Sequence, residues 1–509
     1  MSDQNEVTRR GFIKNAAIVG AGAAAAYAPG AWSSAPAAIP EKWDREADII
    51  VVGYGGAGAC AAITAREAGA EVLILEKLKT GGGNTAISGG VVYAGGTSVQ
   101  KANDIPDTAD KMYQHFLNAG KAFIDPALAR IAADEAAKNI DWLIQLGAKF
   151  NAPVISGAEV PAGSEPIARV HTTRYGGLRG GAAFYGVLAD TAQAKGAKIL
   201  FNTPAKQLIV NADGEVIGVR ADSEGKEIPI KARKAVVLAA GGFSRNKEML
   251  AAYSRDGYYS PSLGVPGLTG DGIRMALALG ADVTNMSKVV DNFGLTLPGA
   301  ERATYAGAGG IVINILARRF VDETLFYDRK GIILLQQPES RAFSIFDEAY
   351  RKARGANIVP GFSAELDKEV AAGIVKKADT PRALAALIKV PADTFEKTVR
   401  KWNEDAKAGA DSDWGRKTLL GPISTPPFYA YETFPVMFDT SGGVKVNTRS
   451  HVVNIWGKVI PRLYAAGVNM GGLVGEFYPG SGTVLNGILT FGRIAGTNAA
   501  AEKPWGTAA

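Results

Sequence analysis

The sequence has few of the residues on which several common kinds of functional site depend. Its 509 residues include one cysteine, Cys60, and three histidines, His115, His171 and His451. One cysteine excludes an internal disulfide, and without a CxxCH motif the chain attaches no c-type haem by itself. The histidines lack HExxH spacing, so we expect no metal site. GxSxG and GxxxxGK[ST] motifs are also absent, which argues against a hydrolase nucleophile elbow and a P-loop.

An excess of charge of one sign is missing as well. The chain carries 56 basic and 50 acidic residues, a net charge of +6, without a Lys/Arg run. Nucleic-acid binding needs clustered positive charge, so we do not expect it. Glycine, in contrast, is abundant at 62 residues, which indicates many tight turns and close backbone approaches. The length predicts two domains or one large domain with an insertion.

The first residues have the pattern of an export signal. TRRGFIK (Thr8 to Lys14) is a twin-arginine motif, followed by an uncharged Ala/Gly-rich stretch and an Ala-x-Ala site at Ala35 and Ala37. The alternative is the basic start of a membrane helix, but Ala and Gly supply too little hydrophobicity for a stable span. We therefore predict a Tat signal over residues 1–37, recognition by the Tat translocase and a periplasmic location.

A βαβ unit with a dinucleotide fingerprint follows, in residues 47–77. Gly53, Gly55 and Gly58 form GxGxxG between an apolar strand and an alanine-rich helix, and Glu76 ends the next strand. This pattern predicts a pyrophosphate at the helix N-terminus and ribose hydroxyls on Glu76. The polar loop GGGNTAISGG (Gly81 to Gly90) favours the longer cofactor FAD over NAD. No second fingerprint for NAD(P)H is present, so we expect a separate electron partner.

The composition of the sequence changes at two points after this unit. From about residue 286 to 428 the chain has more charges, fewer glycine-rich turns and two clear helical stretches, 379–390 and 393–409. We interpret this stretch as an inserted capping domain with a helical and β (α+β) composition. The predicted fold is α/β, with a Rossmann-like FAD-binding domain in two parts, 45–285 and 429–509, on either side of the cap.

Several motifs together resemble the FAD flavoproteins related to soluble fumarate reductase and 3-ketosteroid dehydrogenase. They are VGYGGAGACAA, LEK, GGNTAISGG, AAGGF (239–243), GDG (270–272), RRFVDE (318–323) and LTFGRIAG (489–496). The resemblance implies a FAD domain interrupted by a cap, with the substrate held between them. The expected cofactor-binding residues are Gly53, Gly55, Gly56, Ala57, Gly58, Glu76, Lys77, Asn84, Thr85, Ser88, Gly89, Gly90, Ala205, Gly241, Gly242, Asp271, Gly467, Ser481, Thr483 and Val484.

The resemblance also indicates what the substrate is not. Fumarate reductases hold a dicarboxylate with two arginines and two histidines, because two carboxylates need fixed positive charge. At the matching positions this chain has Asn292, Tyr327, Phe438 and Pro479. We therefore do not expect fumarate reduction by that mechanism.

Tyrosines stand where 3-ketosteroid dehydrogenases have them. Tyr327 follows the R-F-x-x-E motif, where the family uses a tyrosine to remove a proton beside the ketone, provided that neighbours lower its pKa. Tyr478, with Gly482 four residues later, matches the pair that binds the carbonyl oxygen. The chain departs from the family in two places. It has no tyrosine between Lys149 and Arg174, and Gly480 stands where 4-ene-forming enzymes have serine.

Three functions remain open at this point. The first is an exported FAD enzyme that desaturates a 3-ketosteroid or similar cyclic ketone. The second is a periplasmic ene reductase, supplied by a cytochrome, that acts on an unsaturated acid other than fumarate, with Arg174, Arg179 and Arg318 as possible carboxylate ligands. The third is a FAD-carrying electron-transfer subunit. The alternatives for both tyrosines are ordinary packing roles, and His171 is as well suited to orient backbone as to move protons.

Overall fold

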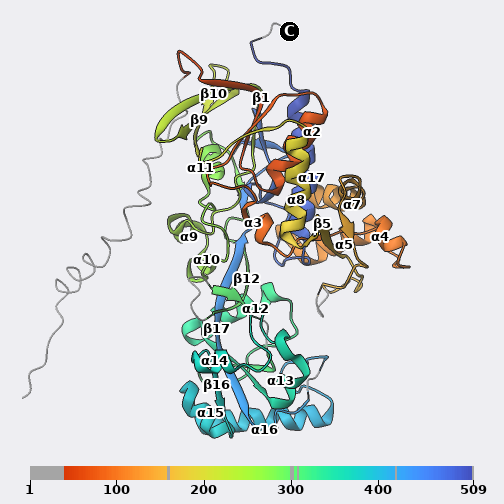
Figure 1. Cartoon of the computed structure of the whole chain (residues 1–509), viewed down its shortest axis with the longest axis vertical. Helices are drawn as coiled ribbons and strands as arrows, with labels where there is room; N and C mark the ends of the chain where they lie inside the picture. The colour runs from red at the N-terminus through yellow and green to blue at the C-terminus, as the bar shows by residue number, and fades with distance from the viewer. Residues whose placement is uncertain (1–38, 157–160, 298–302, 307–308, 419–420, 507–509) are drawn as a thin grey trace, which may run out of the picture.

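A computed structural model describes residues 39–156, 161–297, 303–306, 309–418 and 421–506 (Figure 1). The predicted Tat signal, residues 1–37, lies outside these residues. The predicted α/β fold is confirmed.

The upper part of Figure 1 is built on a sheet in which β1 (Arg45–Val52) is central. Both neighbours of β1 run parallel to it, as expected for the predicted βαβ unit. The strands in order across the sheet are β19 (His451–Val453), β20 (Val459–Ala465), β10 (Lys226–Leu238), β1, β2 (Val72–Leu75) and β7 (Lys198–Leu200), with β9 (Val216–Ser223) on β10 and β8 (Ala205–Val210) on β9. Buried aliphatic residues fill the strands, because helices cover the sheet.

Two helices from opposite ends of the chain pack closely on this sheet. α2 (Gly56–Glu67) follows β1, and α17 (Thr483–Ala501) lies beside it in Figure 1. Gly492 and Gly496 face α2, and a Cβ added at Gly496 would lie 2.2 Å from the Ala61 carbonyl oxygen. The small residues of LTFGRIAG thus allow the two backbones to approach.

The lower part of Figure 1 holds a second, antiparallel sheet. Its strands are β13 (Ala303–Tyr305), β12 (Val289–Thr296), β17 (Phe428–Thr440), β15 (Ala342–Asp347), β14 (Ile311–Asn314) and β16 (Val375–Ala378), and its helices are α12 (Tyr327–Leu335), α13 (Glu348–Arg354), α14 (Asp367–Ala371), α15 (Pro381–Ile388) and α16 (Ala392–Ala408). The two helical stretches expected in the cap are α15 and α16. The hydrogen bonds of β17 continue this sheet as far as Thr440. The predicted end of the cap at residue 428 stays a prediction.

A third group of elements lies between β2 and β7 in the chain, and part of it projects at the right of Figure 1. It contains α3 (Gly83–Ile87), β3 (Val91–Tyr93), α4 (Ser98–Lys101), α5 (Ala109–Gly120), α6 (Pro126–Asp134), α7 (Ala136–Gln145), β4 (Lys149–Phe150), β5 (Val170–Tyr175), β6 (Leu178–Arg179) and α8 (Gly181–Ala194). The remaining elements are α9 (Lys247–Tyr253), α10 (Arg255–Tyr259), α11 (Asp271–Leu277), β11 (Val283–Thr284) and β18 (Gly443–Val444). Gly270 is the N-cap of α11, and Asp271 is its first helical residue.

Candidate active site

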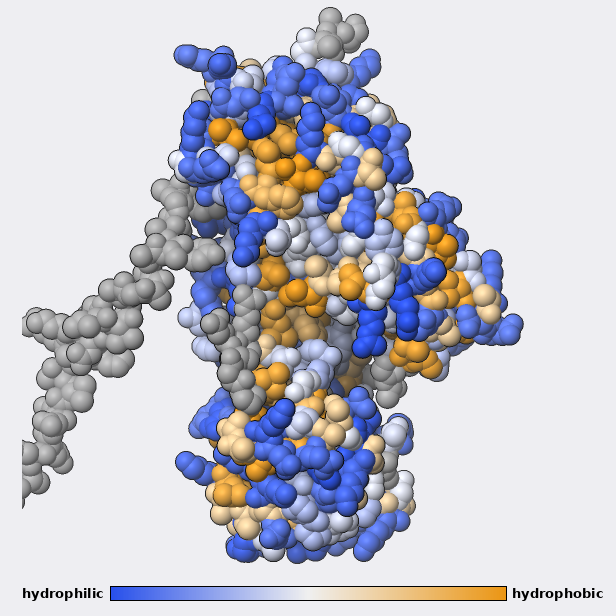
Figure 2. Space-filling view, in the orientation of Figure 1, coloured by the Kyte–Doolittle hydropathy of each residue, from blue (hydrophilic) through white to orange (hydrophobic). Residues whose placement is uncertain are grey.

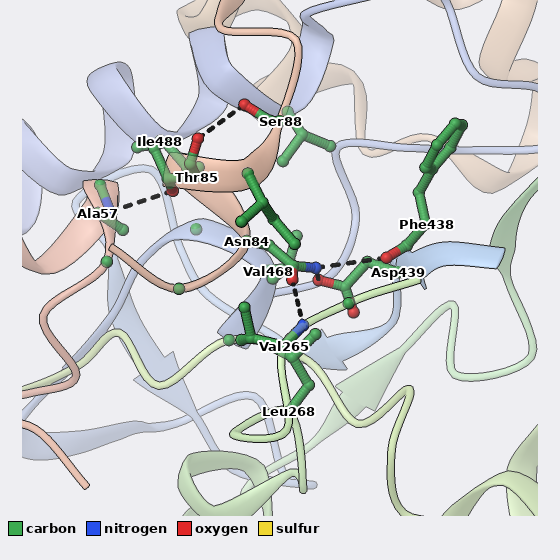
Figure 3. Close-up of a pocket in the computed structure, with 18 of the residues that line it drawn as sticks. Ala57, Asn84, Thr85, Ser88, Val265, Leu268, Phe438, Asp439, Val468 and Ile488 are labelled. Atoms are coloured by element: carbon green, nitrogen blue, oxygen red, sulfur yellow. Dashed lines mark hydrogen bonds between the residues drawn. The ribbon is translucent and has the colours of Figure 1, made fainter. Parts of the chain in front are cut away.

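A cavity of about 690 Å³ lies between the first and second sheets. Four parallel strands, β1, β2, β10 and β20, reach its wall with the residues at their carboxyl ends, which is where α/β sheets bind ligands. β12, β13 and β17 supply the opposite wall. Figure 3 shows Ala57 and Ile488 on one side, Phe438 and Asp439 on the other, and Asn84 between them. Figure 2 shows hydrophobic residues along the waist, between the two parts of the molecule.

The three fingerprint glycines have different roles. Gly53 has a φ of 103°, and a Cβ there would lie 2.5 Å from the Ala239 carbonyl oxygen. A Cβ on Gly58 would lie 2.0 Å from the Gly53 carbonyl oxygen. Gly55 lines the cavity and has no neighbour closer than 3.8 Å to an added Cβ. The first and third glycines therefore permit close packing, whereas the second leaves the backbone open to a phosphate.

Glu76 lies at the same end of the cavity, directly after β2. Its carboxylate accepts hydrogen bonds from the backbone N–H groups of Tyr54, at 2.9 Å, and Leu78, at 2.8 Å. Burial raises its pKa above the ordinary value. Each oxygen keeps a further lone pair for a ribose hydroxyl. Together with the N-terminus of α2, which has no acidic residue in its first turn, Glu76 fits the nucleotide half of FAD.

Asn84 and Asp439 join three segments in the middle of the cavity. The Asn84 amide donates to Asp439 Oδ2 at 2.9 Å, and its Oδ1 accepts from the Val265 N–H at 2.9 Å (Figure 3). The Asp439 carboxyl lines the cavity, and burial raises its pKa to about 7. Because its neutral form is favoured, this carboxyl changes charge near physiological pH.

The far end of the cavity is aromatic. The ring centroids of Tyr327 and Tyr478 are 6.1 Å apart, and Phe438 meets Tyr327 edge-on at 5.5 Å. Val290 and Asn292 complete this end. Among the described residues that line the whole cavity, Lys77 is the one cation, and its ammonium group is bound to Asp271 at 2.7 Å. The aromatic end therefore suits an uncharged, flat ligand.

Tyr478 is held at both its backbone and its hydroxyl group. Its N–H donates to buried Asp328 at 3.0 Å, and Asp328 also binds Lys288 at 2.9 Å. Its phenol oxygen accepts a hydrogen bond from the Val484 N–H, in the first turn of α17, at 3.2 Å. That bond leaves the phenol proton free to be donated into the cavity. Burial raises the pKa of Tyr478 to about 12, which keeps it a neutral donor.

Tyr327 differs from expectation in its proton affinity. It is the first residue of α12 and lines the cavity. A lowered pKa was expected to make it a base, but burial, followed by the nearby Tyr478, raises its pKa well above the ordinary value. No cation lies against it among the described residues that form this end of the cavity. The resting state of this phenol is therefore protonated.

Most of the predicted site residues come together in one place. Tyr327, Tyr478 and Gly482 line the cavity, as do all predicted cofactor residues except Gly58, Gly242 and Thr483. Gly58 packs against Gly53, and a Cβ on Gly242 would lie 2.3 Å from Thr440 Oγ1. Thr483 is buried, and its hydroxyl donates to the Gly480 carbonyl oxygen. These three residues support the cavity from outside. All the residue roles remain predictions.

The arginines considered for a carboxylate site lie elsewhere. Arg174, Arg179 and Arg318 are exposed and do not line the cavity. His171 is buried between Thr97 Oγ1, at 2.9 Å, and the Arg169 carbonyl oxygen, at 2.8 Å, so both of its ring nitrogens are engaged within the fold. This arrangement does not support a role for these arginines as ligands of the carboxylate of an unsaturated acid.

Sequence reasoning missed two supporting residues. The first is Asp439. It follows Phe438, which was compared with a cation of fumarate reductases, but no local pattern predicted that Asp439 would contact Asn84. The second is His115 on α5, whose buried imidazole lies 2.7 Å from the Pro479 carbonyl oxygen. Burial lowers the pKa of His115 to about 4, so the ring is neutral and fixes the turn after Tyr478.

Comparison with known proteins identifies the same cofactor. A model of the FAD binding domain matches residues 48–485. Fumarate reductase (cytochrome) of Shewanella frigidimarina is 31% identical over 473 residues, which cover 92% of this chain and 79% of that protein. Digoxin reductase of Eggerthella lenta is 29% identical over 551 residues, which cover 98% of this chain and 97% of that protein. The predicted cofactor, FAD, is confirmed.

A solved structure is similar over most of the chain. The 3-ketosteroid-delta4-(5alpha)-dehydrogenase of Rhodococcus jostii RHA1 superposes with a TM-score of 0.78 at 30% identity, covering 91% of this chain and 98% of that one. Within the described ranges, no helix is both long and apolar enough to cross a membrane.

Proposed function

We propose, from the premise that this chain belongs to the FAD-binding-domain family of flavoproteins, that it desaturates a 3-ketosteroid or a similar uncharged cyclic ketone. It is a FAD-dependent oxidoreductase. The observation that carries the finer proposal is the aromatic end of the cavity, where Tyr327 and Phe438 stand at positions that hold cations in fumarate reductases and the neutral phenol of Tyr478 lies beside Tyr327.

Three groups of this chain take part in the proposed reaction on bound FAD. Bound FAD supplies the hydride acceptor. The phenol of Tyr478 and the backbone N–H of Gly482 bind the ketone oxygen, so negative charge that develops there is stabilised. Tyr327 takes the proton from the carbon beside the ketone. The substrate thus loses a proton and a hydride from neighbouring carbons.

The protonated state of Tyr327 affects the direction of the reaction. A neutral phenol must first lose its own proton before it can act as a base, which is unfavourable at neutral pH. In the reverse reaction, saturation of an enone, the same phenol starts in the correct state as proton donor. We therefore expect both directions to be measurable, with desaturation favoured at alkaline pH.

A second candidate is the reduction of an unsaturated acid other than fumarate. It is favoured by the 31% identity to fumarate reductase (cytochrome) over most of both chains. Against it stands the charge of the cavity, since the one lining cation among the described residues, Lys77, is already paired with Asp271.

We also propose export to the periplasm by the Tat translocase, on the basis of the twin-arginine motif in residues 8–14. The physiological electron partner is proposed to be a cytochrome or a quinone-linked protein. The relative named fumarate reductase (cytochrome) supports the first kind.

Anaerobic bleaching of the flavin tests the reaction. The yellow protein is mixed with a saturated 3-ketosteroid, and the dithionite-reduced protein is mixed separately with a steroid enone and with unsaturated acids. Bleaching by the ketosteroid, or reoxidation by the enone, is the expected result. Reoxidation by acids alone would replace the proposal with the second candidate. A flavin that responds to none of them would indicate an electron-transfer subunit.

A further inference from the structure

Three positive side chains form a row across the small sheet beside α8. In the antiparallel register Lys149 on β4 lies opposite Arg174 on β5, and Arg174 lies opposite Arg179 on β6. Residues paired in this way share one face of a sheet, with Cβ atoms about 5 Å apart. All three are exposed. We call Lys149, Arg174 and Arg179 the cation row.

The cation row has no acidic partner among the residues that the structure describes. None of its three members takes part in an ion pair, a side-chain hydrogen bond or a cation–π contact there, although most other arginines do. Like charges directly opposite one another destabilise a sheet. The row therefore lowers folding stability, and no contact among the described residues offsets this effect.

The cation row lies next to the cofactor cavity. The backbone N–H of Gly181, two residues after Arg179, donates to the Ser88 carbonyl oxygen at 3.0 Å, and the N–H of Thr173 donates to the Gly90 carbonyl oxygen at 3.1 Å. Ser88 and Gly90 line the cavity. The turn that carries the row is thus bonded to the cavity wall.

The same wall reaches the molecular surface at Ile87. Ile87, the last residue of α3, lines the cavity and is also 59% exposed to solvent. A side chain that both lines the cavity and reaches solvent marks a surface from which electrons have a short path to the cofactor.

We propose that the cation row and Ile87, next to the Ser88 that the hairpin binds, form the docking site for an acidic one-electron-transfer protein. This inference rests on the proposed function as an oxidoreductase with a separate electron partner. In each desaturation the substrate loses two electrons and two protons. Two successive encounters with the one-electron acceptor remove the electrons, and both protons pass to water. Complementary charge speeds such encounters.

Stopped-flow oxidation of the dithionite-reduced holoprotein tests the site. The acceptors are an acidic c-type cytochrome, a basic c-type cytochrome and a small uncharged quinone. The test variant is Lys149→Gln/Arg174→Gln/Arg179→Gln. The control variant is Lys368→Gln/Arg400→Gln/Lys407→Gln, which removes three exposed cations from the cap and has the same net charge.

We expect the test variant to transfer electrons to the acidic cytochrome about tenfold more slowly at low salt, with a weaker dependence on salt. The control variant should match the wild type, and quinone rates should be equal in all three proteins. Equal rates and salt dependence for the test variant and the wild type would overturn the proposal. So would loss of binding to vesicles of anionic lipid without a change in the cytochrome rate, since the row would then serve a membrane. Because no steroid is present, failure here is separate from failure of the proposed reaction.

Discussion

At the scale of single residues, Tyr478 is the group on which the proposed chemistry depends most. We expect Tyr478→Phe to lower the rate of flavin reduction by a 3-ketosteroid about 100-fold, because a hydrogen bond to the developing oxyanion is lost. FAD content should not change. Anaerobic stopped-flow absorbance measures the rate. Tyr464→Phe is the matched control, since that hydroxyl binds Glu502 at 2.7 Å away from the cavity. A fully active Tyr478→Phe would show that the phenol does not bind the carbonyl.

Tyr327 leads to a prediction about pH. Because burial raises its pKa well above the ordinary value, the phenolate fraction grows about tenfold with each unit of pH below that pKa. The rate of desaturation should therefore rise steadily between pH 7 and 10 without a plateau. Tyr327→Phe should remove the rise. A rate that is level over this range in the wild type would mean that another group accepts the proton.

Asp439 connects charge with stability. Its folded pKa of about 7 lies above the ordinary value for an aspartate, so the folded state binds more protons between about pH 4 and 7. The contribution of Asp439 to stability is thus present at low pH and is lost as the pH rises through this window. We expect the melting temperature of Asp439→Asn to fall less than that of the wild type from pH 5 to 8. Calorimetry measures both melting temperatures. An equal fall from pH 5 to 8 in the variant and the wild type would contradict this assignment.

Residues of this kind differ in how well a sequence predicts them. Gly53, Gly55 and Glu76 could be placed because strand, turn and helix fix their spacing locally. Tyr478 could be placed only through the family resemblance. The pairing of Asn84 with Asp439 joins residues 355 positions apart, and the raised pKa of Tyr327 depends on burial between two sheets. Neither property has a local signal.

At the scale of elements, the contact between α2 and α17 holds the fingerprint helix in place. A methyl group added at Gly496 would lie 2.2 Å from the backbone oxygen of Ala61 and 2.3 Å from Thr64 Oγ1. Because the backbone must move, we expect Gly496→Ala to lower the free energy of unfolding by about 1–3 kcal/mol.

Urea denaturation of the holoprotein measures this change. Gly421→Ala is the control, since an added Cβ there meets nothing within 4 Å. If Gly496→Ala were as stable as the control, the helices would not depend on close packing at this point.

The same scale shows where prediction of elements succeeded. The βαβ unit and the helices α15 and α16 were predicted from periodicity and apolar runs. β17 was not, because its 13 residues pair with strands on both sides in the second sheet and then enter the cavity wall at Phe438 and Asp439. Pairing with distant partners decides such a strand.

At the scale of the whole molecule, the cavity lies between two sheets that have separate hydrophobic cores. Ile50 is buried in the core of the first sheet and Ile345 in a core of the second. Lining residues come from both, such as Gly53 after β1 and Asn292 on β12. A ligand that spans the cavity therefore contacts both parts and favours the arrangement in which they meet.

This shared wall predicts that FAD stabilises the molecule as a unit. A ligand that binds only the folded state adds about 2.7 kcal/mol at a concentration 100 times its Kd. The melting temperature of the apoprotein should thus lie several degrees below that of the holoprotein and rise with added FAD. Glu76→Ala should require more FAD for the same rise, because a ribose acceptor is lost, while Glu71→Ala, outside the cavity, should not. In calorimetry the holoprotein should unfold in one transition. The prediction fails if the second sheet melts at the same temperature with and without FAD. The cofactor would then contact the first sheet alone, and binding of FAD would not help to form the substrate end of the cavity.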